Sequence, residues 1–189
     1  MQKKIPYIYY FIDEYNIDEL TNLGKNINLI FRNYKFGPKI NVIKKIHKFC
    51  KVNKRKFYLS NNTKLALKLG LSGVYIPSFN NKINFSSKYS LPKKFEIIGS
   101  AHNINEIKIK NLQKCSKIFI SPIFKTVKTK NFLTVTRLNI MTLNQNLDFI
   151  ALGGINESNY KMLWLTKVKG FAGISWIKKN GLNKFRPFL

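Results

Sequence analysis

The sequence predicts an α/β protein that folds as a compact (β/α)8 TIM barrel. Three observations support this: eight short apolar runs, segments of helical period between most of them, and an average spacing of about 24 residues per run in a chain of 189. That spacing is close to one strand–loop–helix–loop unit, and eight such units can close a barrel. Because no Pro-, Gly- or Ser-rich linker divides the chain, we expect one domain, residues 1–189. An open doubly wound sheet is the alternative.

The eight candidate strands are almost continuously apolar rather than alternating between apolar and polar residues. This pattern is typical of parallel strands that are covered on both faces of a sheet. In chain order they are YIYYF (7–11), INLIF (27–31), KFYLS (56–60), GVYIP (73–77), EIIGS (96–100), KIFISP (117–122), FIALGG (149–154) and GFAGIS (170–175).

The segment 39–54 is the clearest candidate helix. Ile40, Ile43, Ile46 and Cys50 recur at helical spacing, and lysines occupy the other face. We interpret these lysines as a solvated face, and a surface for polyanions is the alternative.

Weaker helical patterns lie between the other strands: IDELTNLGK, TKLALKLG, NINEIKIKNLQK and NESNYKMLWLTK. Asn103 and Asn156 stand just after strands, where an asparagine side chain can cap the first turn of a helix. The fourth connection, residues 78–95, is rich in Asn and Ser and reads as a loop more than a helix.

The formal net charge is +26, from 34 Lys and Arg against eight Asp and Glu. More than half of the chain consists of Lys, Asn, Ile, Phe and Tyr, which codons of A and T alone can encode, so AT-rich coding explains much of the lysine excess. Only four arginines occur, whereas proteins that read bases usually rely on arginine. We therefore expect attraction of small anions rather than a specific nucleic-acid partner.

The composition also excludes several classes of site. Hydrolysis by two converging carboxylates is not expected, because the chain has only eight acidic residues and none lies between Glu19 and Glu96. Cys50 and Cys115 are isolated, which argues against a disulfide framework or a zinc site. No apolar run approaches the roughly 20 residues of a membrane span. We expect a cytoplasmic protein with no membrane partner.

In a barrel, chemistry is expected at the carboxyl ends of the strands. The residues there are mostly polar or cationic, which suits an anionic, phosphorylated ligand. Arg32, in IFRNYK, is suited to clamp a diphosphate. For His102, in IIGSAHN, two roles stay open: proton transfer or ligand contact, and a purely structural role. Ser100 in the same segment has no context that would activate a serine nucleophile.

Glycines at the ends of the last two runs suggest a phosphate-binding corner. Gly153 and Gly154, with Gly173, allow backbone N–H groups to approach a phosphate, although they could instead serve only close strand–helix packing. The loop after the sixth run interleaves hydroxyl and ammonium groups that can surround a diphosphate, unless it is simply a solvated loop. These groups belong to Thr126, Lys128, Thr129 and Lys130.

Five segments, in this order, resemble the thiamine phosphate synthase family and its sister group, the TenI-like thiazole tautomerases. They are LSNNTKLALKLGLSGVYIP, IIGSAHNINEI, FISPIFKTVKTK, FIALGGINESN and GFAGISWI, and the similarity runs from about residue 27 to 177. IFRNYK, YIP and SPIFKT resemble a divergent, alphaproteobacterial-like branch. The resemblance implies a (β/α)8 barrel that couples hydroxymethylpyrimidine diphosphate to thiazole phosphate, releases diphosphate and uses Mg²⁺.

The resemblance also implies roles for individual residues. The group at the pyrimidine diphosphate comprises Arg32, Lys35, Ser100, Thr126, Lys128 and Lys130. The group at the thiazole phosphate, which acts through backbone amides, comprises Gly153, Gly154, Ile174 and Ser175. In the tautomerase alternative, His102 moves a proton on the thiazole ring and no metal is needed. A barrel that binds thiazole phosphate without coupling it is a further alternative.

The chain departs from the family at the metal position. The family holds Mg²⁺ with an Asn-Asp pair and a further Asp, whereas here Ser60 and Asn61 stand at the pair and Asn80 at the second acid. Asparagine is neutral and a much weaker Mg²⁺ ligand. Either lysines replace the metal charge around the diphosphate, or the chain is not a working synthase.

Overall fold

Eight parallel strands form a closed barrel in chain order. The computed structural model describes residues 7–34, 37, 39–83, 89–126, 129 and 131–180. The strands are β1 (Tyr7–Ile12), β2 (Ile27–Phe31), β3 (Phe57–Ser60), β4 (Gly73–Ile76), β5 (Glu96–Ala101), β6 (Lys117–Ile120), β7 (Asp148–Leu152) and β8 (Gly170–Gly173). Because β1 pairs with both β2 and β8, the ring is complete. The predicted TIM barrel is confirmed, and the open sheet is wrong.

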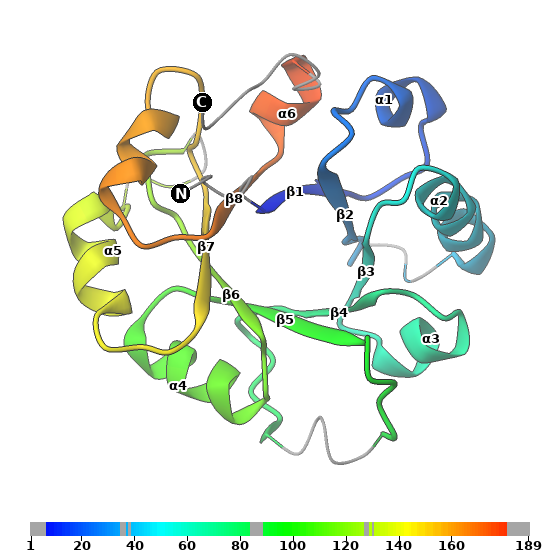
Figure 1. Ribbon diagram of the computed structural model, residues 1–189, viewed down its shortest axis with the longest axis horizontal. Coiled ribbons are helices and arrows are strands. Elements are labelled where there is room, and N and C mark those ends of the chain that lie inside the picture. The colour runs from blue at the N-terminus through cyan, green and yellow to red at the C-terminus, as the bar shows by residue number, and fades with distance from the viewer. Residues whose placement is uncertain are drawn as a thin grey trace.

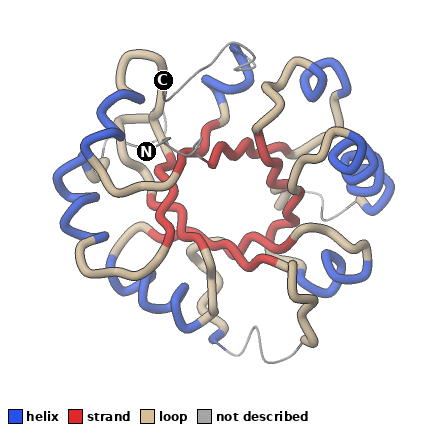
Figure 2. Tube along the Cα trace, in the orientation of Figure 1, coloured by secondary structure: helices blue, strands red, loops and turns tan. Residues whose placement is uncertain are grey.

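Helices cover the outside of the ring, as Figure 1 and the trace in Figure 2 show. They are α1 (Ile17–Thr21), α2 (Ile40–Val52), α3 (Thr63–Lys68), α4 (Ile104–Leu112), α5 (Thr134–Thr142), the 3-10 helix η2 (Tyr160–Leu165) and α6 (Ser175–Asn180). In the connection from β4 to β5, residues 77–82 and 89–95 form no helix, and Ile83 has 3-10 conformation. These described residues agree with the predicted loop, whereas residues 84–88 lie outside the described part of the chain. None of the described helices is long and apolar enough to cross a membrane.

Of the two predicted helix caps, one is right and one is wrong. Asn103 caps α4, and its side chain accepts a hydrogen bond from the backbone N–H of Glu106. Asn156 does not cap a helix, because its Oδ1 accepts from the backbone N–H and the hydroxyl of Ser158 in a local turn. Asn159 takes the N-cap position of η2 instead. A short asparagine side chain favours such turns as readily as helix caps.

Aromatic side chains fill the barrel interior. Tyr9, Tyr58 and Phe119 pack against one another near the amino ends of the strands, with Tyr9 and Phe119 in a T-shaped contact at 4.9 Å between ring centroids. Phe11 and Tyr75 form a second T-shaped contact at 5.3 Å. The interior is therefore a packed core rather than a channel.

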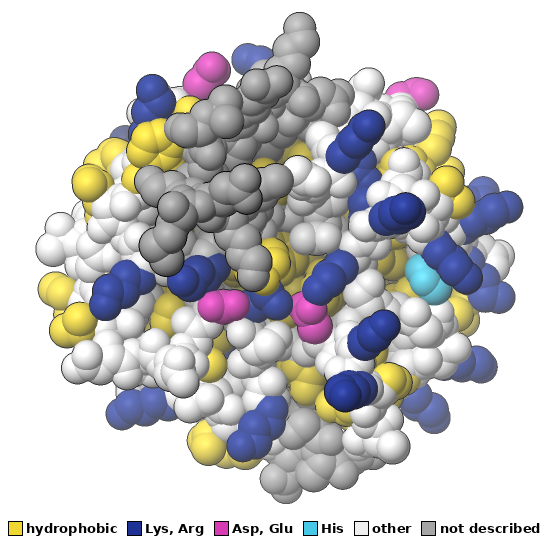
Figure 3. All heavy atoms as spheres, in the orientation of Figure 1, with side chains coloured by type: hydrophobic (Ala, Val, Ile, Leu, Met, Phe, Trp, Pro, Cys, Tyr) yellow, Lys and Arg dark blue, Asp and Glu magenta, His cyan; other side chains and the backbone are white. Residues whose placement is uncertain are grey.

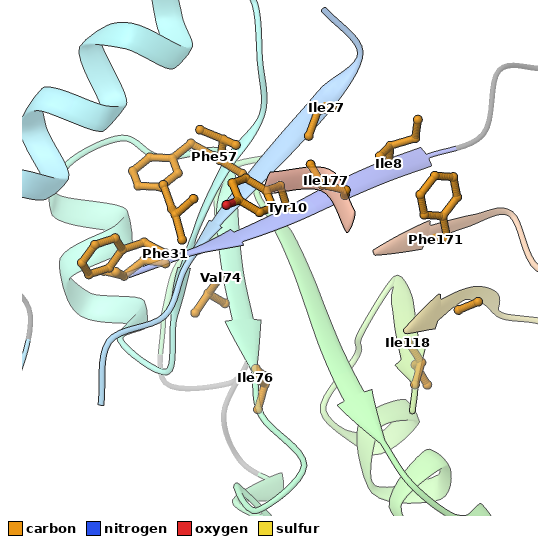
Figure 4. Close-up of a cluster of buried hydrophobic side chains, with 14 of the residues drawn as sticks. Ile8, Tyr10, Ile27, Phe31, Phe57, Val74, Ile76, Ile118, Phe171 and Ile177 are labelled. Atoms are coloured by element: carbon orange, nitrogen blue, oxygen red, sulfur yellow. The ribbon is translucent and has the colours of Figure 1, made fainter. Parts of the chain in front are cut away.

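A larger apolar cluster lies between the strands and the surrounding helices, and Figure 4 shows part of it. From α2 it receives Ile43, Ile46 and Cys50, all buried. Ile40, which was expected on the same face, is exposed. With 100° of rotation per residue, Ile40 lies about 90° around the helix from the centre of the face formed by Ile43, Ile46 and Cys50. It therefore lies at the edge of the face that packs against the strands.

The amino ends of the strands are closed by an ionic cluster. Glu96 accepts hydrogen bonds from Lys56, from Lys117 at 3.0 Å and from the Tyr58 hydroxyl at 2.8 Å. Burial alone raises the pKa of Glu96, but the hydrogen bonds from Lys56 and Tyr58 and the charge of Lys117 bring it below its usual value. Glu96 therefore keeps its charge and anchors two cations on the side of the barrel away from the predicted site.

Candidate active site at the mouth of the barrel

Parallel strands place all their carboxyl ends on one side, and we call this end, with the residues that directly follow each strand, the mouth. Ile30, Ile98 and Phe119 point into the barrel interior. Because side chains alternate along a strand, the residues two positions further also face inward. At the mouth these are Arg32, Ser100 and Ser121, of which Arg32 and Ser100 were predicted from the sequence.

Arg32 presents a cation at the mouth. Its backbone N–H donates to the carbonyl of Ile12 at 2.7 Å, and its guanidinium carbon lies 4.5 Å from the centroid of the Phe11 ring. Ion pairs among the described residues involve only Glu19 and Glu96, so Arg32 has no carboxylate partner in this part of the chain. A guanidinium held by an aromatic face and free of a counter-ion is suited to bind an anion.

Tyr75 joins this group, although the sequence pattern predicted only a core position for it. It is buried, and burial raises the pKa of its hydroxyl to about 12, against the opposing effects of Ser100 and Arg32. The hydroxyl is therefore neutral and polar in an otherwise apolar interior. The only sequence signal was its position near the end of a strand.

His102 is fixed at both ring nitrogens. Nδ1 lies 2.7 Å from the backbone carbonyl oxygen of Ser121, and Nε2 lies 3.1 Å from the hydroxyl of Ser78. Because a carbonyl only accepts, Nδ1 carries the proton in this arrangement, and Nε2 accepts from Ser78. His102 thus links the loops after β4 and β6, which favours the structural role over proton transfer.

Asn61 and Asn80, which the resemblance assigns to the metal position, contact each other at the mouth. Asn80 Nδ2 donates to Asn61 Oδ1 at 2.7 Å, and Asn80 Oδ1 accepts from the backbone N–H of Lys82 at 3.1 Å. Both amide oxygens already accept a protein N–H. Among the described residues, no group of three or more His, Cys, Asp or Glu side chains is placed to hold a metal ion. The residues present do not fit Mg²⁺, which takes oxygen ligands and is usually bound through carboxylates.

An aromatic pair beside these amides was not predicted. Tyr34, which is half-exposed, donates or accepts a hydrogen bond with the Ser60 hydroxyl at 2.9 Å. Its ring contacts that of Phe79 in a T-shaped arrangement at 5.6 Å. The pair joins the loops after β2 and β4. No sequence pattern in either loop indicated that the two loops would be in contact.

The glycines after β7 adopt conformations that favour glycine. Gly153 has φ +91° and Gly154 has φ +72°. A Cβ on Gly154 would lie 2.5 Å from the carbonyl oxygens of Phe124 and Lys125, so only glycine fits. The backbone N–H of Phe124 also donates to the Gly153 carbonyl at 3.1 Å. The glycine corner and the loop after β6 are therefore in direct contact, which makes close packing a sufficient reason for these glycines.

Three further predicted residues, Thr126, Ile174 and Ser175, follow β6 and β8, the two strands beside β7. Thr126 Oγ1 accepts a hydrogen bond from the backbone N–H of Thr129 at 3.0 Å. Ile174 and Ser175 follow β8 and are exposed. Lys35, Lys128 and Lys130 lie outside the described residues.

Carboxylates are also present near the mouth. Asp13 and Glu14 follow β1 directly, and Glu106 lies in the first turn of α4. Glu106 accepts from the His102 backbone N–H at 2.8 Å and from Asn103 Nδ2 at 3.0 Å, so it acts in the cap of α4.

A closed ring of parallel strands with polar residues at their carboxyl ends defines a (β/α)8 barrel of the kind that carries its site at the mouth. The family model described as thiamine monophosphate synthase matches residues 29–177, and the chain belongs to this family. The family predicted from the sequence is confirmed.

Individual relatives agree with this assignment. A thiamine-phosphate synthase from Prochlorococcus marinus is 31% identical over 140 residues, which are 71% of this chain and 39% of that protein. One from Pelagibacter ubique is 29% identical over 153 residues, which are 79% of this chain and 72% of that protein. The match thus spans well under half of the Prochlorococcus protein.

The solved structure of thiamine phosphate pyrophosphorylase from Pyrococcus furiosus is similar to this one with a TM-score of 0.75. The likeness covers 96% of both chains at 16% sequence identity. At that identity it shows a common fold.

Proposed function

We propose that the protein is a transferase of thiamine biosynthesis that couples hydroxymethylpyrimidine diphosphate to thiazole phosphate and releases diphosphate. The family and the names of its relatives support this activity. The observation that carries it is the Arg32 guanidinium, which stands at the mouth beside Phe11 and has no carboxylate partner among the described residues. Such a cation matches a leaving group that is itself an anion.

The reaction needs charge stabilisation more than it needs a base. The bond between the pyrimidine methylene carbon and a diphosphate oxygen breaks, and its electron pair leaves with the diphosphate. The thiazole nitrogen then donates its lone pair to the cationic methylene, which forms the new C–N bond. A fixed cation beside the departing diphosphate lowers this barrier, and the apolar surroundings of Phe11 and Tyr75 strengthen its effect.

The two substrates would occupy opposite parts of one mouth. Arg32 follows β2, whereas the Gly153–Gly154 turn follows β7, on the other side of the ring. A diphosphate on the first and a phosphate held by the amides of Gly154, Ile174 and Ser175 on the second would bring the two rings together over the barrel axis. The loop of Thr126, with Lys128 and Lys130, would close around the diphosphate.

The enzyme would be cytoplasmic, and its charge supports small phosphorylated partners rather than a specific nucleic-acid partner. In Figure 3 the Lys and Arg side chains are scattered over the face shown and do not gather into one stripe. A scattered excess of lysine raises the local concentration of small anions without providing a binding surface for a duplex.

The decisive experiment is a coupling assay. Purified protein is mixed with hydroxymethylpyrimidine diphosphate and thiazole phosphate, once with Mg²⁺ and once with EDTA, and thiamine phosphate is measured. Thiamine phosphate is expected to form. If none forms under either condition, the protein is not a synthase.

A further inference from the structure

We infer that the position at which the family resemblance implies Mg²⁺ is occupied in this chain by an anion-facing amide pair, Asn61 and Asn80, and that the protein binds diphosphate without a divalent cation. The inference rests on the proposed function for the identity of the anion.

The orientation of both amides follows from one backbone group. The Lys82 N–H donates to the side chain of Asn80, so the atom that it meets must be the oxygen. The Asn80 nitrogen is thereby directed to Asn61, where the atom at 2.7 Å must be an acceptor. The pair is therefore a donor–acceptor chain with a defined direction, from Lys82 through Asn80 to Asn61.

The groups left over on this pair are donors. Among the described residues, no acceptor is hydrogen-bonded to Asn61 Nδ2, and Asn80 Nδ2 donates only to Asn61, which uses one of its two N–H groups. Amide N–H groups bind phosphate oxygens, whereas Mg²⁺ needs oxygen ligands. The polarity of the pair thus suits the anion and opposes the cation.

The spacing leads to the same conclusion. Two carboxylates as close as these two side chains would repel each other and would need a cation between them. The two amides need none, because an N–H bridges the gap. In this chain the hydrogen bond from Asn80 Nδ2 to Asn61 Oδ1 holds the two side chains together, so no cation is needed between them.

Hydrogen bonds to the backbones of Asn61 and Asn80 hold the amide pair in place. Asn61, with φ +57°, donates its backbone N–H to the Tyr75 carbonyl at 2.8 Å. The buried ammonium of Lys110 donates to the backbone carbonyls of Pro77 and Asn80, each at 2.8 Å. The protein thereby fixes a positive charge of its own next to the backbone of Asn80. Together with Arg32 and the net charge of +26, this charge would compensate the diphosphate in place of a metal.

Titration calorimetry with inorganic diphosphate tests the inference, in EDTA and in Mg²⁺. The wild-type protein is expected to bind diphosphate at least as tightly in EDTA as in Mg²⁺. The Asn61→Asp/Asn80→Asp variant is expected to lose about tenfold or more in affinity in EDTA, because two charges are added beside the anion, and to regain affinity with Mg²⁺.

The matched control is Asn111→Asp/Asn144→Asp, which makes the same chemical change twice. Asn111 is exposed in the last turn of α4, and Asn144 is exposed in a turn before β7, so both lie at the end of the barrel away from the mouth. This control is expected to bind like the wild type under both conditions. If wild-type binding is tenfold tighter in Mg²⁺ than in EDTA, or if the Asn61→Asp/Asn80→Asp variant binds like the control in EDTA, the inference is wrong. Should the double variant fail to fold, the wild-type comparison and the single Asn61→Asp variant decide.

The coupling assay separates this inference from the proposed function. Thiamine phosphate formed in Mg²⁺ but not in EDTA would retain the synthase and overturn the inference. Diphosphate binding in EDTA without thiamine phosphate under either condition would overturn the synthase and retain the inference.

Discussion

The ammonium of Lys110 in α4 donates a 2.8 Å hydrogen bond to the backbone carbonyl of Asn80, in the loop that follows β4. Gln113 adds bonds from its Nε2 to the carbonyls of Asn80 and Lys82, at 2.8 and 3.1 Å. Lys110 in the last turn of α4 and Gln113 at its C-cap thus hold the described part of the connection between β4 and β5. A buried cation that donates to three acceptors is a strong constraint, because its removal takes a donor from the carbonyls of Pro77 and Asn80 and from Gln113 Oε1 at once.

We therefore expect Lys110→Met to destabilise the protein by about 2 kcal/mol, since it takes one donor from the carbonyls of Pro77 and Asn80 and leaves the buried Gln113 Oε1 without the donor it has in the wild type. Urea unfolding followed by circular dichroism measures the loss. The control is Lys108→Met, an exposed lysine of the same helix, which should change stability little. Equal unfolding midpoints for the two variants would contradict this role.

Lys110 also shows where sequence reasoning reached its limit. The eight strands could be predicted because each is a continuous apolar run, and the carboxyl ends then fixed Arg32, Ser100, Asn61 and Asn80 as site candidates. A lysine in a helix of mixed polarity reads as exposed, and its burial depends on a loop about 30 residues away in the sequence. Such a contact between distant segments leaves no periodic signal in either of them.

The same limit applies to the mouth itself. Tyr75 reads as an apolar strand residue, because nothing local shows that its hydroxyl reaches the mouth. The predicted helix cap at Asn156 was wrong because a turn with Ser158 uses the same side-chain oxygen. In both cases the residue type allowed two roles: core or mouth for Tyr75, and helix cap or turn for Asn156. The tertiary structure, which the sequence pattern does not show, determined which role each residue has.

Glu96 should give the protein part of its resistance to acid. Its pKa in the folded state lies below the ordinary value of about 4.3, so its contribution is present above that value and is lost as the pH falls through the folded pKa. We expect the free energy of unfolding of Glu96→Gln to fall less steeply between about pH 5 and pH 3 than that of the wild type. Urea unfolding at several pH values measures both slopes. Glu157→Gln, an exposed residue with the same change in charge, serves as the control, and identical slopes for the two variants would refute the role of Glu96.

Replacement of Arg32 should affect catalysis rather than folding. Arg32→Ala removes the cation at the mouth, and we expect kcat/KM for coupling to fall by about 100-fold or more, because donors to a departing anion contribute at that level. Arg137→Ala, an exposed arginine of α5, is the control for loss of one positive charge. Thermal unfolding should occur at similar temperatures in both variants. Wild-type turnover of Arg32→Ala would mean that the diphosphate binds elsewhere.

His102 should prove structural. In His102→Asn the amide Nδ2 takes the place of the ring Nδ1 and can still donate to the carbonyl of Ser121, so we expect coupling within about threefold of the wild type, whereas loss of a general acid or base costs about 100-fold or more. Stability should fall by about 1 kcal/mol, because the bond to Ser78 is lost. Steady-state kinetics and urea unfolding give the two readouts. A 100-fold loss of turnover at unchanged stability would instead indicate that His102 transfers a proton.

Gly154 and Gly70 allow backbone strain to be separated from close packing. Both have positive φ, +72° and +60°, but a Cβ at Gly154 would meet two carbonyl oxygens at 2.5 Å, whereas a Cβ at Gly70 has nothing within 4 Å. Gly70→Ala should therefore cost only the left-handed conformation, about 1 kcal/mol. Gly154→Ala must in addition push the loop after β6 away from the corner, so we expect a loss of about 3 kcal/mol or more together with weaker binding of thiazole phosphate. Unfolding in urea and titration calorimetry with thiazole phosphate measure the two effects. If Gly154→Ala costs no more than Gly70→Ala, the contact between the glycine corner and the loop of Thr126 does not constrain the mouth.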